Sequence, residues 1–247
     1  MLNNAKIIRF LDRTNGSMSI ERIWDSFNEE IKDYGFVAAG YAFSNGLKQG
    51  AIADEMVYFG SYRNDYVQTY IDERLADDDY AMLYGSANDA PAFWSDIVSM
   101  NMTAGRARFQ SIASDFGLKE GLVVPFRGGE NEEAPRSGVA LQSDSEQPEQ
   151  HRAFVKAYLG EIVQLCAVFD NAMRRPTSIK EMYGLSPREL ECIKHLCHGR
   201  TNKEIADRLA LSDKTVEHYI AKAMSKLKSR NRHHAAAKAV LPALTKT

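Results

Sequence analysis

The chain has 247 residues, which is enough for one domain of ordinary size and a second, small one. Its formal net charge of −2 hides an uneven distribution, because residues 1–177 carry 17 Lys and Arg against 26 Asp and Glu, whereas residues 178–247 carry 14 against 7. An acidic body joined to a basic tail is the pattern expected where only the tail meets a polyanion.

The composition also bears on the compartment. No run of the sequence approaches the ~20 apolar residues needed to span a bilayer, and the first residues contain no apolar core of signal-peptide length. The three cysteines, Cys166, Cys192 and Cys197, are an odd number and do not resemble a disulfide framework. We therefore expect a cytoplasmic protein without membrane contact.

The first half of the chain alternates between helical and strand patterns. Amphipathic helix covers roughly the first 30 residues and breaks at Thr14 to Ser17. Short apolar runs then predict strands, and a helical pattern and an acidic, glycine-rich hairpin loop separate them. The predicted strands are residues 35–43, 56–62, 122–126 and 137–143, with the helix at 64–75 and the hairpin loop at 128–136.

A long helix is predicted next, over residues 147–173. Its apolar stripe either packs on its own domain or forms a subunit interface. Residues 174–184 are a plausible linker, because Pro176 disfavours helix at the residue before it. The stripe consists of Phe154, Tyr158, Ile162, Leu165, Phe169 and Met173.

Three helix starts follow in quick succession after Gly184. Ser186 to Glu189 and Thr201 to Glu204 both fit the capping box, and Ser212 can cap a third helix. Gly199 can take the left-handed conformation that the end of the first helix needs. Only Ala210 and Leu211 separate the second helix from the third. Two short helices across a tight turn form a helix-turn-helix, whose second helix enters the major groove.

The third helix has two faces. Val216, Ile220, Ala223, Met224 and Leu227 are spaced for burial. The opposite face carries basic side chains, which can neutralise phosphates, and the small side chain of Ala221, which allows close approach to DNA. The alternative interpretation is a basic helix that faces only solvent. The residues expected at the DNA are Lys203, Lys214, Thr215, Glu217, His218, Ala221, Lys222, Lys226, Lys228 and Arg230.

At this point residues 185–239 resemble the LuxR-type helix-turn-helix. The resemblance implies a compact four-helix domain that dimerises on a two-fold symmetric, double-stranded DNA operator, with RNA polymerase as a further partner. Tyr219 departs from the family, which usually has histidine there, and Glu217 stands where many members have lysine or asparagine. The matching residues are Glu189, Gly199, Glu204, Ile205, Ala206, Leu209, Ser212, Thr215, Val216, Lys226, Leu227, Asn231, Arg232 and Ala236.

Glu217 therefore has two interpretations. It pairs with Lys214 one turn earlier, an interaction worth only ~0.2–0.5 kcal/mol. Alternatively, its carboxylate lies in the groove and accepts a hydrogen bond from a cytosine amino group.

The tail also contains a group of four residues of the types that bind metal ions. Cys192, His195, Cys197 and His198 lie within seven residues. On one helix Cys197 points away from the others, and the chain has no second ligand cluster, so we expect no metal and no cofactor.

The acidic body does not follow the β/α alternation of a phosphoacceptor receiver. It resembles instead the acyl-homoserine-lactone-binding domain of quorum-sensing regulators, through Tyr70, Asp79, Trp94 and the stretch FGLKEGLVVPF at residues 116–126. By this resemblance Asp79 accepts from the amide N–H of the lactone, Tyr70 donates to a carbonyl and Trp94 packs on the ring. Tyr66 and Phe109 are further candidates for the ligand site. Taken singly, these aromatics could be ordinary core residues and Asp79 one acid of an exposed run.

Two departures leave the ligand open. Tyr66 stands in the place of a tryptophan that meets the lactone carbonyl, and Tyr80 replaces a proline after the aspartate. The chain is thus an altered lactone receptor, a receptor for another small molecule, or a ligand-independent regulator. A signal-degrading hydrolase is the alternative from another class, but the sequence contains no nucleophile elbow, metal-ligand pair or His-supported serine, so we expect no enzyme and no catalytic residues.

The sequence as a whole predicts an α+β protein. Residues 1–173 form an α-β-α sandwich with an antiparallel sheet that binds the autoinducer, residues 174–184 a linker, and residues 185–247 an all-α, four-helix DNA-binding domain. The expected function is ligand-responsive transcription regulation by a cytoplasmic homodimer, with the sign of the response open.

Overall fold

A computed structural model describes residues 5–14, 19–44, 57–100, 102–127, 136–175 and 183–227, together with residues 229, 231, 232 and 235. The chain divides into two compact units, Met1–Asp170 and Asn171–Thr247. The proposed 174–184 linker lies mostly outside the described residues. The two units are described separately below.

The first unit is built on a five-stranded sheet in the order β2-β1-β5-β4-β3, and each neighbouring pair is antiparallel. The four strands expected from the sequence are confirmed, and β4 and β5 form the predicted hairpin. The two-residue β3 was not predicted, because so short a strand leaves no alternation to detect. The strands are β1 Ala38–Ser44, β2 Val57–Gly60, β3 Ala92–Phe93, β4 Glu120–Arg127 and β5 Arg136–Ser143.

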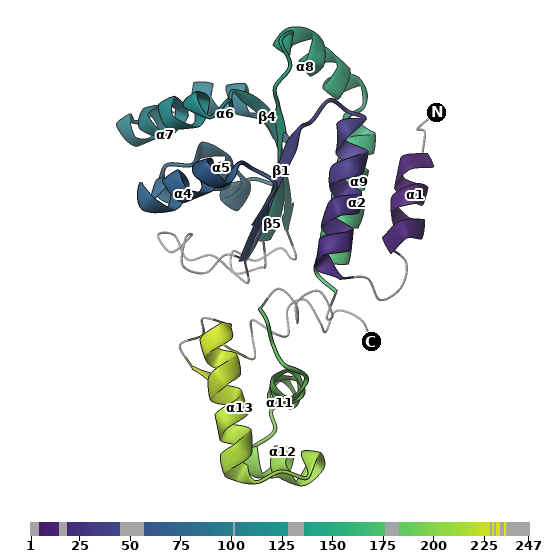
Figure 1. Cartoon of the computed structure of the whole chain (residues 1–247), viewed down its shortest axis with the longest axis vertical. Helices are drawn as coiled ribbons and strands as arrows, with labels where there is room; N and C mark the ends of the chain where they lie inside the picture. The colour runs from purple at the N-terminus through teal and green to yellow at the C-terminus, as the bar shows by residue number, and fades with distance from the viewer. Residues whose placement is uncertain are drawn as a thin grey trace. The chain divides into compact units, whose positions relative to one another are not determined.

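Helices cover both faces of the sheet, which confirms the α-β-α sandwich (Figure 1). On one side α2 and α9 pack on the sheet, with α1 outside α2, and on the other side lie α4 to α7. The helices are α1 Ala5–Thr14, α2 Ile20–Lys32, α4 Asn64–Asp72, α5 Tyr80–Ala87, α6 Trp94–Met100, α7 Ala104–Asp115, α8 Pro148–Ala157 and α9 Leu159–Met173, and the short 3-10 helix η1 spans Leu75–Asp77.

The face under α2 and α9 forms a closed aromatic core. Phe27 of α2 stacks on Phe169 of α9 with ring centroids 4.0 Å apart, and Tyr41 of β1 meets Phe169 edge-on at 5.2 Å. The hydroxyl of Tyr41 donates to Asp170 Oδ1 over 3.0 Å, so the polar end of the ring is satisfied. Burying one such ring contributes roughly 1.5–3 kcal/mol. This core fixes the sheet from one side and leaves the other side to carry a site.

The single helix predicted for residues 147–173 is wrong. The chain forms α8 and α9, which meet at Tyr158, whose carbonyl accepts from the N–H groups of Glu161 and Ile162. Gly160 has a low helix propensity at this point. The predicted apolar stripe is therefore not one continuous buried face. Its first two residues, Phe154 and Tyr158, are exposed. The residues that follow on the stripe, Ile162, Leu165, Phe169 and Met173, are buried.

The tail unit consists of three described helices, α11 Pro187–Cys197, α12 Asn202–Leu209 and α13 Asp213–Lys226. Both predicted capping boxes are confirmed, and Ser212 caps α13 by accepting from the N–H of Thr215 over 3.1 Å. Ala210 turns the chain from α12 into α13 with φ of +53°, a left-handed conformation that costs a non-glycine residue ~1–2 kcal/mol. The tight turn of a helix-turn-helix is thus formed despite this strain.

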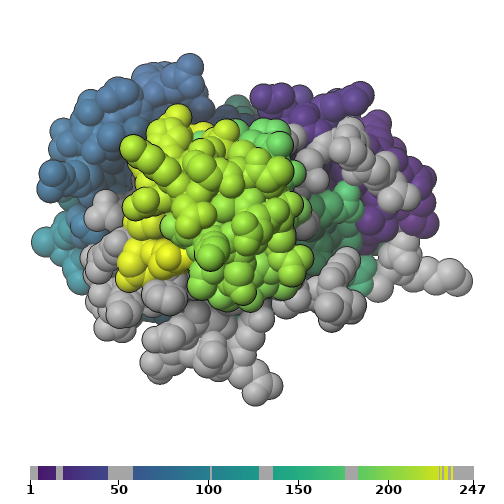
Figure 2. Space-filling model, turned by 90° about the horizontal axis from the view of Figure 1, so that it is seen from below, coloured from purple at the N-terminus to yellow at the C-terminus, as the bar shows by residue number. Residues whose placement is uncertain are grey.

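Side chains of the three helices close around one core, and Figure 2 looks onto the compact body that they form. Of the residues predicted to be buried on α13, Met224 is partly buried and the others are fully buried. The fourth helix of the predicted domain lies largely outside the described residues, although Ala235 is buried in the same core. Within the described part of the chain, no helix is both long and apolar enough to cross a membrane.

Candidate ligand and DNA-binding sites

The sheet face under α4 to α7 has a floor of small residues. Gly60 pairs with Gly40, Gly40 with Ala140, and Ala140 with Val123, so one row across four strands carries little side-chain bulk. Ala140 lies on the central strand β5 and still keeps accessible surface, whereas Val139, which faces the other side, is fully buried. The low bulk of this row therefore leaves room for the side chains that cover this face of the sheet.

A cluster of aromatic rings lies on this face of the sheet. The ring centroids of Tyr66 and Tyr70 are 5.9 Å apart, and those of Tyr70 and Phe109 are 6.3 Å apart. Tyr66, Trp94 and Phe109 belong to one buried cluster, and Tyr70 packs against it. Asp79 joins the cluster through a hydrogen bond from Tyr70. The structure thus brings together all five residues predicted for a ligand site. We call the place where these five side chains meet the aromatic hollow.

Asp79 lies at the N-cap of α5. Its Oδ1 accepts from the N–H groups of Ala81 and Met82 over 2.9 and 3.0 Å, and its Oδ2 accepts from the hydroxyl of Tyr70 over 3.0 Å. Burial raises the pKa of Asp79, and these three hydrogen bonds oppose that shift. Oδ2 keeps a lone pair for one more donor.

Two further tyrosines belong to the hollow and were not predicted. A Cβ added at Gly40 would lie 3.0 Å from Cε2 of Tyr62 and 3.1 Å from the hydroxyl of Tyr58, so both rings lie over the floor. The hydroxyl of Tyr62 donates to the carbonyl of Ala140 over 3.4 Å. Burial, together with the nearby carboxylate of Asp79, raises the pKa of Tyr62. The spacing of four residues from Tyr58 through Tyr62 to Tyr66 was the available signal in the sequence.

Some polar groups of the hollow have no partner. The indole N–H of Trp94 is buried and no described group accepts from it. Among the described residues, the hydroxyls of Tyr66 and Tyr80 form no hydrogen bond either, but unlike the indole N–H they are not fully buried. A buried donor without an acceptor costs about 1–3 kcal/mol. The buried indole N–H of Trp94, in one cluster with two hydroxyls that form no hydrogen bond, indicates a place where a molecule with acceptor groups would be stabilised.

Trp94 owes its position to a glycine. A Cβ at Gly121 would lie 2.5 Å from Cε2 of Trp94 and 2.3 Å from the carbonyl oxygen of Leu141. The indole therefore lies directly on the backbone of β4. Only a residue without a side chain allows this approach.

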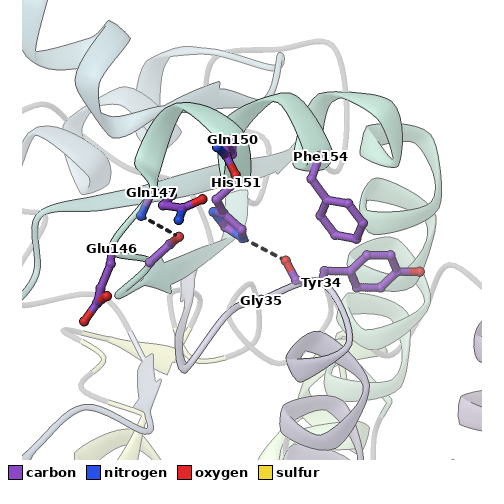
Figure 3. Close-up of a pocket in the computed structure, with 8 residues that line it drawn as sticks. Tyr34, Gly35, Glu146, Gln147, Gln150, His151 and Phe154 are labelled. Carbon is purple, nitrogen blue, oxygen red and sulfur yellow. Dashed lines mark hydrogen bonds between the residues drawn. The ribbon is translucent and has the colours of Figure 1, made fainter.

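A second hollow lies at the junction of α2 and α8 and has a volume of about 440 Å³ (Figure 3). The imidazole of His151 donates from Nε2 to the carbonyl of Tyr34 over 2.8 Å, and it fills the space above Gly35, whose φ is +80°. None of the residues predicted for a ligand site lines this hollow. The contacts of His151 hold the turn after α2 in place.

The exposed face of α13 carries the residues predicted to meet DNA. Within the described part of the chain, Lys214, Glu217 and Lys222 form no ion pair, and their side chains extend into solvent. His218 and Ala221 are exposed on the same face, and Lys203 is exposed on α12. Thr215 differs, because its hydroxyl shares a hydrogen bond with Ser212 over 2.7 Å.

Lys226 has a structural contact. Its ammonium donates to the carboxylate of Glu189 over 2.7 Å and to the carbonyl of Gly184 over 2.8 Å. Burial opposes the ionisation of Glu189, but hydrogen bonds from Lys226 and Ser186 outweigh it and lower the pKa of Glu189. Lys228 and Arg230, the remaining predicted phosphate contacts, lie outside the described residues.

The cysteines and histidines of α11 serve other contacts. Cys192 is buried, Arg200 bonds to Nδ1 of His195, and His198 bonds through its Nδ1 to the carbonyl of Lys194 over 2.7 Å. Within the described residues, no group of three His, Cys, Asp or Glu side chains is placed to hold a metal ion.

Two sites of different chemistry therefore lie on one chain, an aromatic hollow with unpaired donors and an exposed basic helix face. Together they define a regulator that combines a small-molecule sensor with a DNA reader. Family models agree, since residues 19–169 match the autoinducer binding domain and residues 184–239 match the bacterial regulatory proteins of the luxR family. The chain belongs to the LuxR family of quorum-sensing transcriptional regulators.

Relatives align along most of the chain. The transcriptional activator protein VanR of Vibrio anguillarum is 26% identical over 239 residues, which cover 96% of each chain. The quorum sensing-dependent transcriptional regulator RpaR of Rhodopseudomonas palustris is 26% identical over 219 residues, or 87% of this chain and 84% of its own.

Solved structures share the fold. Escherichia coli SdiA has a TM-score of 0.53 at 14% identity and covers 95% of both chains. CepR2 of Burkholderia cenocepacia, an N-acylhomoserine lactone-dependent LuxR family factor, has a TM-score of 0.51 at 13% identity, over 70% of this chain and 94% of its own. At these identities the likeness supports the fold alone.

Proposed function

We propose that the first unit binds an N-acyl-homoserine lactone, or a close chemical relative, in the aromatic hollow. The observation that carries this proposal is the buried indole N–H of Trp94, which has no acceptor among the described residues and lies in one cluster with the hydroxyl-bearing Tyr66 and Tyr80. A lactone with an amide-linked acyl chain offers one N–H donor and several carbonyl acceptors. Its polar groups are therefore complementary to those of the hollow.

The partners can be assigned by this complementarity. The free lone pair on Oδ2 of Asp79 accepts from the amide N–H of the ligand. The indole N–H of Trp94 and the hydroxyl of Tyr66 donate hydrogen bonds to the carbonyl groups of the ligand. Tyr70 cannot do so, because its single proton is already donated to Asp79. Phe109 and the glycine and alanine floor accommodate apolar atoms of the ligand.

The second unit would bind a two-fold symmetric DNA operator as a homodimer through α13. Lys214, Lys222 and Lys203 supply phosphate contacts and His218 and Ala221 face the bases, which agrees with their exposure. Ligand burial stabilises the sensor and shifts the population of the DNA-binding dimer. The protein then acts in the cytoplasm, with RNA polymerase as its partner at the promoter, and it binds the signal without hydrolysing it.

One observation favours a second candidate, a ligand-independent regulator. Both oxygens of Asp79 already accept hydrogen bonds from the chain, and the rings of Tyr58 and Tyr62 lie over the floor where a ligand would pack. A sensor unit with its own groups in the hollow could keep its fold without a signal. The two candidates differ in whether added lactone changes stability.

Purification from cells grown with and without added acyl-homoserine lactones separates these candidates. Extraction of the protein followed by mass spectrometry should recover an intact lactone, and the thermal midpoint should rise with lactone. Recovery of no lactone, with unchanged thermal midpoint and unchanged DNA binding, would overturn the receptor proposal in favour of the ligand-independent one. Recovery of only the ring-opened product would instead point to hydrolysis.

A further inference from the structure

Glu217 is a carboxylate on the DNA-facing side of α13, close to Lys214, His218 and Lys222. It is exposed, and it lies in the N-terminal half of the helix, the part of a recognition helix that reaches base edges. A negative charge at this place is unusual for a surface that approaches phosphates. It would be stabilised by a cation or a hydrogen-bond donor, either in the protein or in the DNA.

The chain itself supplies no partner among the described residues. Arg188 and Glu191 on α11, three residues apart, form an ion pair at 2.9 Å. Lys214 and Glu217 have the same separation and form none. The interpretation of Glu217 as half of a surface pair is therefore not supported.

Electrostatics then decide what Glu217 can do on DNA. Phosphates repel a carboxylate, so an unpaired Glu217 would weaken binding to every sequence unless a base donates to it. The donors in the major groove are the N4 amino group of cytosine and the N6 amino group of adenine. Adenine carries the N7 acceptor beside its amino group, which repels a second carboxylate oxygen, whereas cytosine has no acceptor at that edge.

We propose that Glu217 accepts a hydrogen bond from the N4 amino group of a cytosine in the major groove, and thereby specifies one base pair in each half of the operator. This inference rests on the proposed DNA-binding function of α13 and names the base that one of its residues reads. The neighbouring Lys214 and Lys222 hold the backbone on either side.

The test is a selection of bound duplexes from a library with a randomised core, using the full-length protein with and without acyl-homoserine lactones. Wild type should select a cytosine at one symmetric position. Glu217→Gln should lose that preference by roughly 5- to 150-fold and shift it toward adenine, because a glutamine amide pairs with adenine N6 and N7. Glu217→Ala should lose the cytosine preference without gaining adenine.

Glu191→Gln is the matched control, since it removes one exposed negative charge from the same unit, on α11 instead of α13. It should keep the wild-type consensus. An identical consensus for wild type and Glu217→Gln, or the same shift in Glu191→Gln, would overturn the inference. If wild type selects no sequence under either condition at low salt, the DNA-binding proposal fails and this inference fails with it.

Discussion

The hydroxyl of Tyr70 donates a hydrogen bond to Oδ2 of Asp79 over 3.0 Å. The bond links the last turns of α4 to the N-cap of α5. A phenol has one proton, so Tyr70 cannot also donate to a ligand carbonyl while this bond is formed. We therefore propose that Tyr70 positions the carboxylate, whereas the resemblance to lactone-binding domains implied a donor to the ligand carbonyl.

Tyr70→Phe tests this role. The variant keeps the ring contacts to Tyr66 and Phe109 but leaves Oδ2 of Asp79 without its donor. We expect lactone-dependent stabilisation to fall by about 1–2 kcal/mol, roughly a 5- to 30-fold loss of affinity. The pKa of Asp79 should rise further, because the lost hydrogen bond is one of those that lower it. Thermal shift titrations with lactone over a pH series measure both effects.

Tyr84→Phe is the control for this change. The ring of Tyr84 also packs against the aromatic cluster, but its hydroxyl donates to the carbonyl of Ala90 over 3.0 Å, and not to Asp79. It should respond to lactone as wild type does. If Tyr70→Phe also responds as wild type does, the hydroxyl of Tyr70 has no part in ligand binding.

Asp79→Asn should separate ligand binding from stability. Asparagine caps helices as well as aspartate does, so α5 keeps its N-cap, while the carboxylate that the ligand amide needs is lost. We expect no lactone-dependent stabilisation in this variant, and unchanged stability or a gain at neutral pH. Asp72→Asn, at an exposed position on α4, should leave the lactone response intact. A normal lactone response in Asp79→Asn would remove Asp79 from the site.

The pH dependence of Asp79 has a definite sign. Its pKa is raised in the folded chain, so the folded state binds this proton more tightly than the unfolded state does. The protonated carboxyl therefore stabilises the fold below its unfolded pKa, and this contribution is lost as the pH rises through the folded pKa. Chemical unfolding should show wild type gaining stability relative to Asp79→Asn as the pH falls from neutral. A constant difference between the two proteins would contradict the shift.

Local signals explain why so much of the tail could be predicted. The capping boxes at Ser186 and Thr201 and the two faces of α13 depend on residues three or four positions apart, and such spacings are visible in one sequence. The first unit's strands were visible for the same reason, through short apolar runs bounded by glycine.

The contacts that shape the aromatic hollow are non-local, and the sequence did not show them. Trp94 fits because Gly121, 27 positions later, has no side chain, and Tyr62 lies over Gly40 of β1, 22 positions earlier. Which side chains can donate to a ligand carbonyl depends on the hydroxyl proton of Tyr70, which is donated to Asp79, and the sequence does not show this hydrogen bond. The break at Tyr158 was missed because apolar spacing continues across it.

The packing of Trp94 on β4 can be tested by substitution of Gly121. Gly121→Ala places a methyl group 2.5 Å from the indole and 2.3 Å from the carbonyl oxygen of Leu141, so the sheet or the indole must move. We expect a loss of roughly 1–3 kcal/mol in unfolding free energy, together with weaker lactone binding. Gly138→Ala, where the nearest atom is 3.6 Å away, should be close to neutral. Equal unfolding free energies of the two variants would contradict this packing argument.

Lys222 and Lys226 lie one turn apart on α13, and we expect Lys222 to contribute to DNA binding and Lys226 to the stability of the fold. Lys222 is exposed and forms no ion pair within the described part of the chain, so Lys222→Ala should weaken binding to all duplexes and reduce the slope of log affinity against log salt by about 1. Lys226 holds the carboxylate of Glu189, which is only 3% exposed. Lys226→Ala leaves that charge without its cation.

We expect Lys226→Ala to lower the unfolding free energy of the tail by roughly 1–2 kcal/mol, at the low end for a broken ion pair because Lys226 is 39% exposed. Its salt slope should match wild type. Because the pKa of Glu189 is lowered in the folded state, the stabilisation by this pair is present above the unfolded pKa and is lost as the pH falls through the folded pKa. The destabilisation should therefore shrink in acid. A reduced salt slope in Lys226→Ala, with unchanged stability, would assign Lys226 to a phosphate instead.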